Sequence, residues 1–278
     1  MLDSLIIGGG PAGLTAGIYL MRAGLSCALY EKQFCGGQAA TTNWIENYPG
    51  FPDGIGGPEL SMAMAEQAQK LGLEIRYDEI TELHLTDTER YAIAGGKRID
   101  ARTVVLCMGA TPRPLGLAEE ERLRGRGVSY CATCDGAFFR GKEVCVVGGG
   151  DTAMEDVLYL ARFASKVTII HRRDSFRAAQ ALVRRVQQTP NVKILYHTVV
   201  KALRGEEQLE EIVMQNTLSG AESAFRTQGL FVAVGTVPQT ELLAGQLALQ
   251  EGYVIAGEDT RTSVRGVYAA GDIRTKPL

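Results

Sequence analysis

The chain has 278 residues, of which 45% are hydrophobic, and this length exceeds what one hydrophobic core usually organises, so the sequence predicts two domains. The formal net charge of −3 gives no basic surface of the kind that binds nucleic acid or anionic membranes, so we exclude those partners and expect a small molecule or a protein. The residues from Met1 to Ser4 lead straight into an apolar strand, so we expect no signal peptide, no membrane span and a cytoplasmic location.

The first predicted unit is a strand, a glycine turn, a helix and a second strand. Apolar residues 5–7 precede the turn, a helix is expected over 11–23, and the strand over 27–30 ends at an acid. The glycines allow close backbone approach, the helix start offers N–H groups to a pyrophosphate, and an acid about 20 residues later suits a ribose hydroxyl. This context favours a dinucleotide site over a mere tight turn. Its residues are Gly8, Gly10, Pro11, Ala12, Gly13 and Glu31.

Two cysteines, Cys131 and Cys134, form the only Cys-x-x-Cys pair of the sequence, followed by Asp135. A disulfide across so small a loop would stabilise the fold by only about 2 kcal/mol, so a structural staple explains the pair poorly. Zinc would need a second pair of ligands, and no other close cluster of Cys and His is present. Redox exchange is the interpretation that remains.

The other four cysteines have simpler explanations. Cys27, Cys107 and Cys145 lie in apolar strands, so we expect them to be small buried side chains. For Cys35, beside Gly36, packing is favoured over a redox role.

A second copy of the unit follows the cysteines. A strand over 144–147, a glycine turn, a helix over about 152–163 and a strand over 167–170 repeat the first pattern. Here, however, the second strand ends in a basic cluster instead of an acid. Guanidinium groups suit a 2′-phosphate, which indicates NADP rather than NAD, although a solvated basic helix start is the alternative. The residues are Gly148, Gly150, Asp151, Thr152, Ala153, His171, Arg172, Arg173 and Arg177.

Each copy continues into short alternating strands and then a buried strand stopped by Gly and Pro. The alternating strands are expected over 80–85 and 91–94, and over 199–203 and 211–216. The buried strands end near Pro112 and Pro238, which we interpret as the two crossings between domains. Residues 253–278 would then complete the first unit, and two adjacent crossings would serve as a hinge.

With these motifs the chain resembles the low-molecular-weight, bacterial-type thioredoxin reductases over residues 1–278. The resemblance rests on both glycine turns, the dithiol followed by Asp135, the basic cluster, and the segments 36–38, 46–50 and 271–272. It implies an α/β fold of two Rossmann-like three-layer nucleotide-binding domains, of pyridine nucleotide-disulfide oxidoreductase class II. The FAD domain would cover 1–114 and 240–278, with the NADPH domain, 115–239, inserted into it. The resemblance adds these FAD-binding residues: Lys32, Gly37, Gln38, Asn47, Gly109, Gly271 and Asp272.

The resemblance also implies a reaction. Electrons would pass from NADPH to FAD, then to the Cys131–Cys134 disulfide and on to thioredoxin. Cys134 would face the flavin, Cys131 would attack the partner disulfide, and Asp135 would move the thiol proton. Because nicotinamide and dithiol share one domain and one flavin, the domains would rotate between the half-reactions. A homodimer is expected.

Three other functions stay open at this point. The same dithiol could serve a glutaredoxin-like protein or a component of a peroxidase system. An NADPH-dependent flavin reductase or oxidase would not need the dithiol, and a redox-sensing flavoprotein would not turn over repeatedly. The sequence departs from the family at Leu278, where members normally continue into a helix that faces the flavin.

Overall fold

The computed structural model describes residues 1–42 and 44–275, and the chain forms two compact units. Unit 1 comprises residues 1–111 and 237–278, and unit 2 comprises residues 112–236. The crossings therefore fall a few residues before the expected limits at 114 and 239. The segments that cross, β7 (Ala110–Pro112) and β16 (Thr236–Pro238), pair as a two-stranded sheet.

Unit 1 is built on a sheet with the strand order β3-β2-β1-β6-β5-β4, in which β19 also pairs with β6. The pairs among β1, β2, β3, β6 and β19 are parallel, while β4, β5 and β6 form an antiparallel meander. These strands are β1 (Leu2–Ile7), β2 (Cys27–Glu31), β3 (Glu74–Tyr77), β4 (Ile80–Leu85), β5 (Arg90–Ala94), β6 (Lys97–Leu106) and β19 (Val267–Ala269). Because β19 pairs with β6, the last part of the chain completes the sheet begun by the first.

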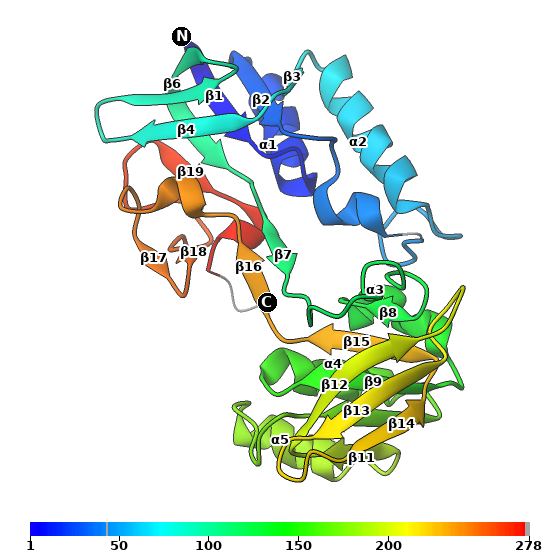
Figure 1. Cartoon of the computed structure of the whole chain (residues 1–278). Coiled ribbons are helices and arrows are strands. Elements are labelled where there is room, and N and C mark those ends of the chain that lie inside the picture. The colour runs from blue at the N-terminus through cyan, green and yellow to red at the C-terminus, as the bar shows by residue number, and fades with distance from the viewer. Residues whose placement is uncertain (43, 276–278) are drawn as a thin grey trace. The chain divides into compact units, whose positions relative to one another are not determined.

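Two helices, α1 (Pro11–Arg22) and α2 (Gly57–Lys70), lie side by side on one face of this sheet (Figure 1). Successive residues of β1 point to opposite faces. Ile6 packs with Leu14 under the helices, whereas Leu5 and Ile7 pack with residues of β4, β5 and the C-terminal segment. Both faces of this part of the strand are thus covered, which is why residues 5–7 are all apolar. The shorter elements of unit 1 are η1 (Gly37–Thr41), η3 (Glu241–Leu243), β17 (Leu249–Gln250), β18 (Tyr253–Val254) and η4 (Gly271–Ile273).

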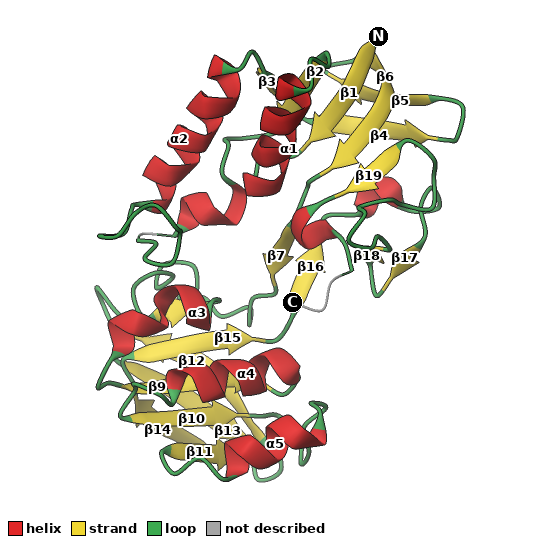
Figure 2. Ribbon diagram, turned by 180° about the vertical axis from the view of Figure 1, so that it is seen from behind, coloured by secondary structure: helices red, strands yellow, loops and turns green. Residues whose placement is uncertain are grey.

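Unit 2 has three layers, shown from the other side in Figure 2. Its central parallel sheet has the order β11-β10-β9-β15-β8, and a separate antiparallel sheet has the order β12-β13-β14. Helices α4 and α5 cover one face and the antiparallel sheet covers the other. The elements are β8 (Val128–Ser129), α3 (Ala132–Asp135), η2 (Gly136–Phe139), β9 (Glu143–Gly148), α4 (Asp151–Leu160), β10 (Lys166–Ile170), α5 (Gln180–Gln187), β11 (Val192–Leu195), β12 (Thr198–Arg204), β13 (Glu211–Asn216), β14 (Glu222–Arg226) and β15 (Gly229–Ala233).

The predicted α/β fold with two Rossmann-like, three-layer units is confirmed. Two details differ from the sequence-based expectation. Helix α4 ends at Leu160 rather than Phe163, because the N–H groups of Arg162 and Phe163 bond three residues back in a tighter turn. Helix α2 was not predicted, although Pro58 in its first turn followed by Glu59 is a typical start signal.

Candidate active site with a dithiol and two glycine turns

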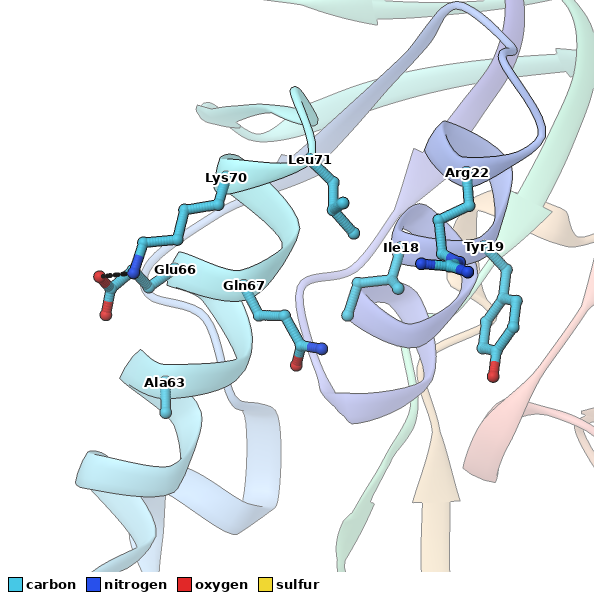
Figure 3. A pocket seen from close by; sticks show the side chains of 8 residues that line it. All are labelled: Ile18, Tyr19, Arg22, Ala63, Glu66, Gln67, Lys70 and Leu71. Atoms are coloured by element: carbon cyan, nitrogen blue, oxygen red, sulfur yellow. Dashed lines mark ion pairs between the residues drawn. The ribbon is translucent and has the colours of Figure 1, made fainter.

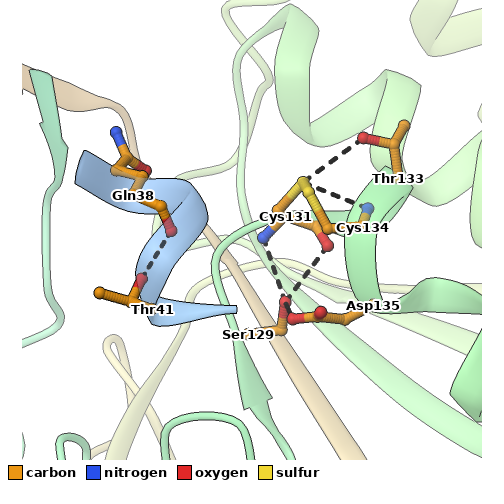
Figure 4. Close-up of a disulfide and its surroundings, with 7 residues drawn as sticks. All are labelled: Gln38, Thr41, Ser129, Cys131, Thr133, Cys134 and Asp135. Atoms are coloured by element: carbon orange, nitrogen blue, oxygen red, sulfur yellow. Dashed lines mark hydrogen bonds between the residues drawn. A yellow bond between two sulfur atoms is a disulfide. The ribbon is translucent and has the colours of Figure 1, made fainter. Parts of the chain in front are cut away.

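Cys131 and Cys134 are joined in a disulfide at the start of α3, with their Cα atoms 5.3 Å apart (Figure 4). Both residues are half-buried, so the bond is neither enclosed in the core nor fully exposed. The backbone N–H of Cys134 donates to Sγ of Cys131 over 3.2 Å. An N–H donor at this position would stabilise a thiolate on Cys131 after reduction, which is what thiol exchange needs.

Asp135 is held by a short hydrogen bond to a residue that the sequence did not single out. The Ser129 hydroxyl donates to Oδ2 of Asp135 over 2.6 Å. Burial raises the pKa of Asp135 above its ordinary value, while the Ser129 hydrogen bond and the charge of Arg124 oppose that rise. A carboxyl group with a raised pKa beside a dithiol is suited to exchange a proton.

Glu120 is a second residue near the dithiol that the sequence did not single out. It is only 3% exposed, and Oε1 accepts bonds from the N–H of Leu115 (2.8 Å) and the Tyr130 hydroxyl (2.6 Å). Its Oε2 accepts from the N–H groups of Gly116 and Leu117. This carboxylate therefore fixes the segment before the dithiol and the side chain next to Cys131. In a run of three glutamates only the burial identifies it.

The glycines of the first turn separate into two kinds. A Cβ on Gly8 would lie 2.3 Å from the Cys107 carbonyl oxygen, and one on Gly13 would lie 1.9 Å from the Gly8 carbonyl oxygen. These two are required by packing. Gly10, by contrast, has an ordinary φ of −71° and no atom closer than 4.0 Å to such a Cβ. Nothing within the protein requires glycine there, so the open backbone before α1 fits a phosphate ligand.

Several predicted FAD-binding residues gather around this turn. Oε2 of Glu31 accepts the N–H of Gly9 over 2.7 Å, and the N–H of Gly36 bonds to the Gly9 carbonyl. Gly37 approaches Gly10, and a Cβ on Gly271 would meet Ala12 at 2.9 Å. The segment containing Gly271 and Asp272 thus adjoins the start of α1, far away in sequence.

The remaining predicted FAD-binding residues have different surroundings. Nε2 of Gln38 donates to the Ala110 carbonyl, and Gly109 has a positive φ of 69° with open space at its Cβ position. Lys32 and Asn47 are exposed. Within residues 1–42 and 44–275, no recorded side-chain contact joins either of them to the glycine turn.

The second turn repeats the division of the first. A Cβ on Gly148 would lie 2.4 Å from the Ala233 carbonyl oxygen and 2.7 Å from the Ala153 side chain, so packing requires glycine there. Gly150 has an ordinary φ of −97° and nothing within 4 Å of its Cβ position. The start of α4 is therefore open in the same way as the start of α1. Thr152 is exposed beside it.

The basic cluster is tied to this second turn through the backbone. The N–H of Arg177 donates to the Gly149 carbonyl over 2.8 Å, and Oδ1 of Asp151 accepts the N–H of Ala179 over 2.7 Å. Arg172, Arg173 and Arg177 are exposed, and in the described part of the chain no ion pair or hydrogen bond engages their guanidinium groups. Three cations beside an open helix start suit a ligand with phosphate groups.

His171 lies apart from these exposed cations. It is 7% exposed, with Nδ1 2.8 Å from the Gly148 carbonyl oxygen and Nε2 2.8 Å from the Ser175 carbonyl oxygen. Both ring nitrogens thus face backbone carbonyl oxygens, and the ring supports the turn: a Cβ on Gly149 would fall 2.2 Å from its Cε1 atom. That His171 binds NADPH stays a prediction.

The other singled-out residues behave as packing elements. Cys27, Cys107 and Cys145 are buried, as predicted. Cys35 is buried too, its Sγ lies 3.8 Å from the Tyr77 hydroxyl, and burial raises its pKa.

Away from both turns, a groove of about 510 Å³ runs between α1 and α2 (Figure 3). Ile18, Tyr19 and Arg22 line it from α1, and Gln67 and Lys70 line it from α2. In the described ranges we find no helix that is long and apolar enough to cross a membrane.

Comparison with known proteins gives one consistent result. The family model for pyridine nucleotide-disulphide oxidoreductases matches residues 2–278. The thioredoxin reductase of Bacillus subtilis (strain 168) is 45% identical over 280 residues, covering 99% of this chain and 88% of its own. The crystal structure of thioredoxin reductase from Streptococcus pyogenes MGAS5005 is similar with a TM-score of 0.92 and 40% identity, covering 100% of this chain and 91% of its own. Thioredoxin reductase from Giardia duodenalis gives a TM-score of 0.92 with 37% identity, covering 100% of this chain and 91% of its own.

These matches cover both units of the chain. The chain is an oxidoreductase of the pyridine nucleotide-disulphide oxidoreductase family, and within that family it belongs to the low-molecular-weight, bacterial-type thioredoxin reductases.

Proposed function

We propose that the chain is an NADPH-dependent thioredoxin-disulfide reductase that holds FAD in unit 1 and NADPH in unit 2. The observation that carries the proposal is the Cys131–Cys134 disulfide, which lies in the same unit as an open glycine turn flanked by three exposed arginines. In this proposal electrons pass from NADPH to the disulfide through FAD. Unit 1 would hold the FAD at a glycine turn of the same kind.

In unit 1 the residues fit FAD. The open backbone at Gly10 and the N–H groups at the start of α1 would receive the pyrophosphate, and Glu31 would accept a ribose hydroxyl. Asp272, which follows Gly271 beside Ala12, would bond a hydroxyl of the ribityl chain. When bound, FAD would accept a hydride from NADPH and deliver an electron pair to a disulfide.

In unit 2 the residues fit NADPH. Gly150 and the start of α4 would receive the pyrophosphate, and Arg172, Arg173 and Arg177 would bind the 2′-phosphate. Two guanidinium contacts of about 1.5–3 kcal/mol each would favour NADPH over NADH by roughly two to four orders of magnitude. His171 would hold the turn in shape.

The dithiol would perform the exchange with the partner. The Cys131 thiolate, stabilised by the Cys134 N–H, would attack the partner disulfide and form a mixed disulfide, releasing one partner thiolate. The Cys134 thiolate would then attack Sγ of Cys131, which restores the internal disulfide and releases the second partner thiolate. Asp135 would carry the protons that these thiols gain and lose.

Rotation of the two units between half-reactions is part of the proposal. The chain passes between the units twice, at the paired strands β7 and β16, which would serve as the hinge. Two relatives that are each 37% identical to the chain, from Giardia duodenalis and Lactococcus lactis, superpose on it with TM-scores of 0.92 and 0.67. Because the two relatives are equally identical to the chain, the difference between their TM-scores supports the view that the two domains are arranged differently in these two relatives. Bifunctional reagents that cross-link the units should stop turnover, and full activity after cross-linking would rule out rotation.

Thioredoxin is the partner we propose. A relative from Mycobacterium leprae that is 42% identical carries the name bifunctional thioredoxin reductase/thioredoxin, so in that protein both activities share one chain. A cytoplasmic location belongs to the same proposal, since a reducing compartment keeps the four free cysteines as thiols and makes an exchangeable disulfide useful.

We also propose a homodimer formed through α1 and α2. Tyr19, which lines the groove between these helices, is 68% exposed, and Met62 of α2 is 73% exposed. Large exposed apolar side chains on both helices favour a protein contact. Tyr19→Glu should convert a dimer into a monomer in light-scattering measurements, whereas Leu218→Glu, at a similarly exposed apolar residue of unit 2, should not.

One set of assays tests the function. Protein with a flavin spectrum should reduce thioredoxin with NADPH far better than with NADH. Cys131→Ser should abolish thioredoxin reduction while NADPH still reduces the flavin, and Cys35→Ser should retain both activities. Thioredoxin reduction that survives in Cys131→Ser would contradict the proposal.

A further inference from the structure

Among the described residues, Ser129 is the one whose hydroxyl contacts both the backbone of Cys131 and the carboxyl group of Asp135. It ends β8, is 4% exposed, and lies between the backbone of Cys131 and the carboxyl group of Asp135 (Figure 4). Its oxygen takes part in three contacts. It donates to Oδ2 of Asp135 over 2.6 Å, accepts the N–H of Cys131 over 3.1 Å, and lies 3.3 Å from the Cys131 carbonyl oxygen.

A hydroxyl group has one proton to donate and two lone pairs to accept with. The three contacts therefore cannot all be satisfied in one way. While Asp135 is ionised, the Ser129 hydroxyl donates its proton to Oδ2 over 2.6 Å. It then has no proton left to donate to the Cys131 carbonyl oxygen, 3.3 Å away. The N–H of Cys131 occupies one lone pair in either case.

When Asp135 is protonated the same three partners can be satisfied in another way. The new O–H of Asp135 donates to the second lone pair of Ser129, and the Ser129 proton turns to the Cys131 carbonyl. No proton leaves Ser129, and no buried polar group loses its partner. A side chain that is satisfied in both states lowers the cost of changing between them.

We propose that Ser129 is a positioning residue whose hydroxyl turns between Asp135 and the Cys131 carbonyl each time Asp135 gains or loses a proton. The inference rests on the proposed function, because it assumes that Asp135 exchanges protons with the dithiol.

Other charged groups lie around this pair. Arg124 acts on Asp135 from the segment before β8, and Asp156 stands on α4, which packs against α3. Arg124 and the Ser129 hydroxyl favour the ionised carboxylate, whereas burial favours the neutral acid. Loss of the hydroxyl leaves Arg124 alone against burial, so the carboxyl should hold its proton to higher pH.

The experiment compares Ser129→Ala, Asp135→Asn and the double variant with wild type across pH. Ser129→Ala should slow thioredoxin reduction by about tenfold, and the limb of its pH profile should move to higher pH by about one unit. NADPH-dependent flavin reduction should stay within about twofold in the same samples. Ser129→Thr, which keeps the hydroxyl, should keep the wild-type limb even if its rate falls.

Ser4→Ala is the matched control, because Ser4 is a buried serine whose hydroxyl has no partner among the described residues, and its profile should be unchanged. If Ser129 acts through Asp135, its removal should add little in the Asp135→Asn background. A wild-type profile in Ser129→Ala, an equal limb shift in Ser129→Thr, or full additivity in the double variant would each overturn the inference. Full activity of Asp135→Asn would instead overturn the role proposed for Asp135.

Discussion

Nδ1 of His171 lies 2.8 Å from the Gly148 carbonyl oxygen. The residue that follows β10 therefore holds the glycine turn that follows the adjacent strand β9. The opposite ring nitrogen is 2.8 Å from the Ser175 carbonyl oxygen. The ring thus joins the turn to the segment that carries the arginines, and both parts of the proposed NADPH site depend on it.

Replacing His171 by Ala should therefore weaken NADPH binding without removing a phosphate contact. We expect the KM for NADPH to rise several-fold and the KM for NADH to rise by a similar factor, since the shared turn is disturbed. Steady-state kinetics with both cofactors measure this. A selective loss for NADPH alone would show instead that the ring contacts the 2′-phosphate.

The arginines, in contrast to His171, should affect the KM for NADPH selectively. Arg172→Ala with Arg173→Ala should raise the KM for NADPH by about a hundredfold or more and change the KM for NADH little. Arg184→Ala with Arg185→Ala, two exposed cations on α5, removes the same charge and should have a small effect on both. Equal effects on the two cofactors would refute the 2′-phosphate assignment.

Two glycines of the second turn should respond differently to the same substitution. Gly148→Ala places a methyl group 2.4 Å from the Ala233 carbonyl oxygen and should destabilise unit 2 by about 2 kcal/mol or more. Gly150→Ala meets no atom within 4 Å and should leave the free energy of unfolding within about 1 kcal/mol of wild type, yet raise the KM for NADPH at least tenfold. Denaturant unfolding and kinetics on the same samples decide. Unimpaired NADPH binding in Gly150→Ala would remove the pyrophosphate from this turn.

Glu120 should matter for stability far more than its neighbour in sequence. Glu120→Gln replaces an acceptor oxygen of this buried side chain with an NH₂ group that faces N–H donors, and it should cost at least about 2 kcal/mol in urea unfolding. Glu121→Gln, at an exposed side chain, should change the free energy of unfolding by less than about 0.5 kcal/mol. Similar losses in both variants would mean that the hydrogen bonds around Glu120 contribute little.

Asp156 should make the stability of unit 2 depend on pH. Burial, with a smaller effect from Glu155, raises the pKa of Asp156 from 3.8 to about 7. The folded state then binds the proton more tightly than the unfolded state, so the stabilisation is present below pH 3.8 and is lost as the pH rises towards 7. Asp156→Asn should remove this decline, raising stability at pH 8 relative to wild type by up to a few kcal/mol. Unfolding curves of both proteins with the same pH slope would contradict the shift.

The local sequence determined much of the fold and the positions of the main motifs. Strand, glycine turn, helix and second strand appear twice, and both copies fold as predicted because period, turn chemistry and apolar content act over short distances. The pairing of Cys131 with Cys134 is likewise local, since only two residues lie between them. The acid at Glu31 lies beside its turn because the second strand of such a unit pairs next to the first.

Only the tertiary structure decided what each residue does within those motifs. Packing against Cys107 and Ala233, residues distant in sequence, separates the glycines required by the fold from Gly10 and Gly150, which stand open. Burial showed that His171 supports the glycine turn and distinguished Glu120 from the glutamates on either side of it. Such roles depend on which distant backbone groups a side chain meets and how much water it loses, and neither quantity can be derived from residue order alone.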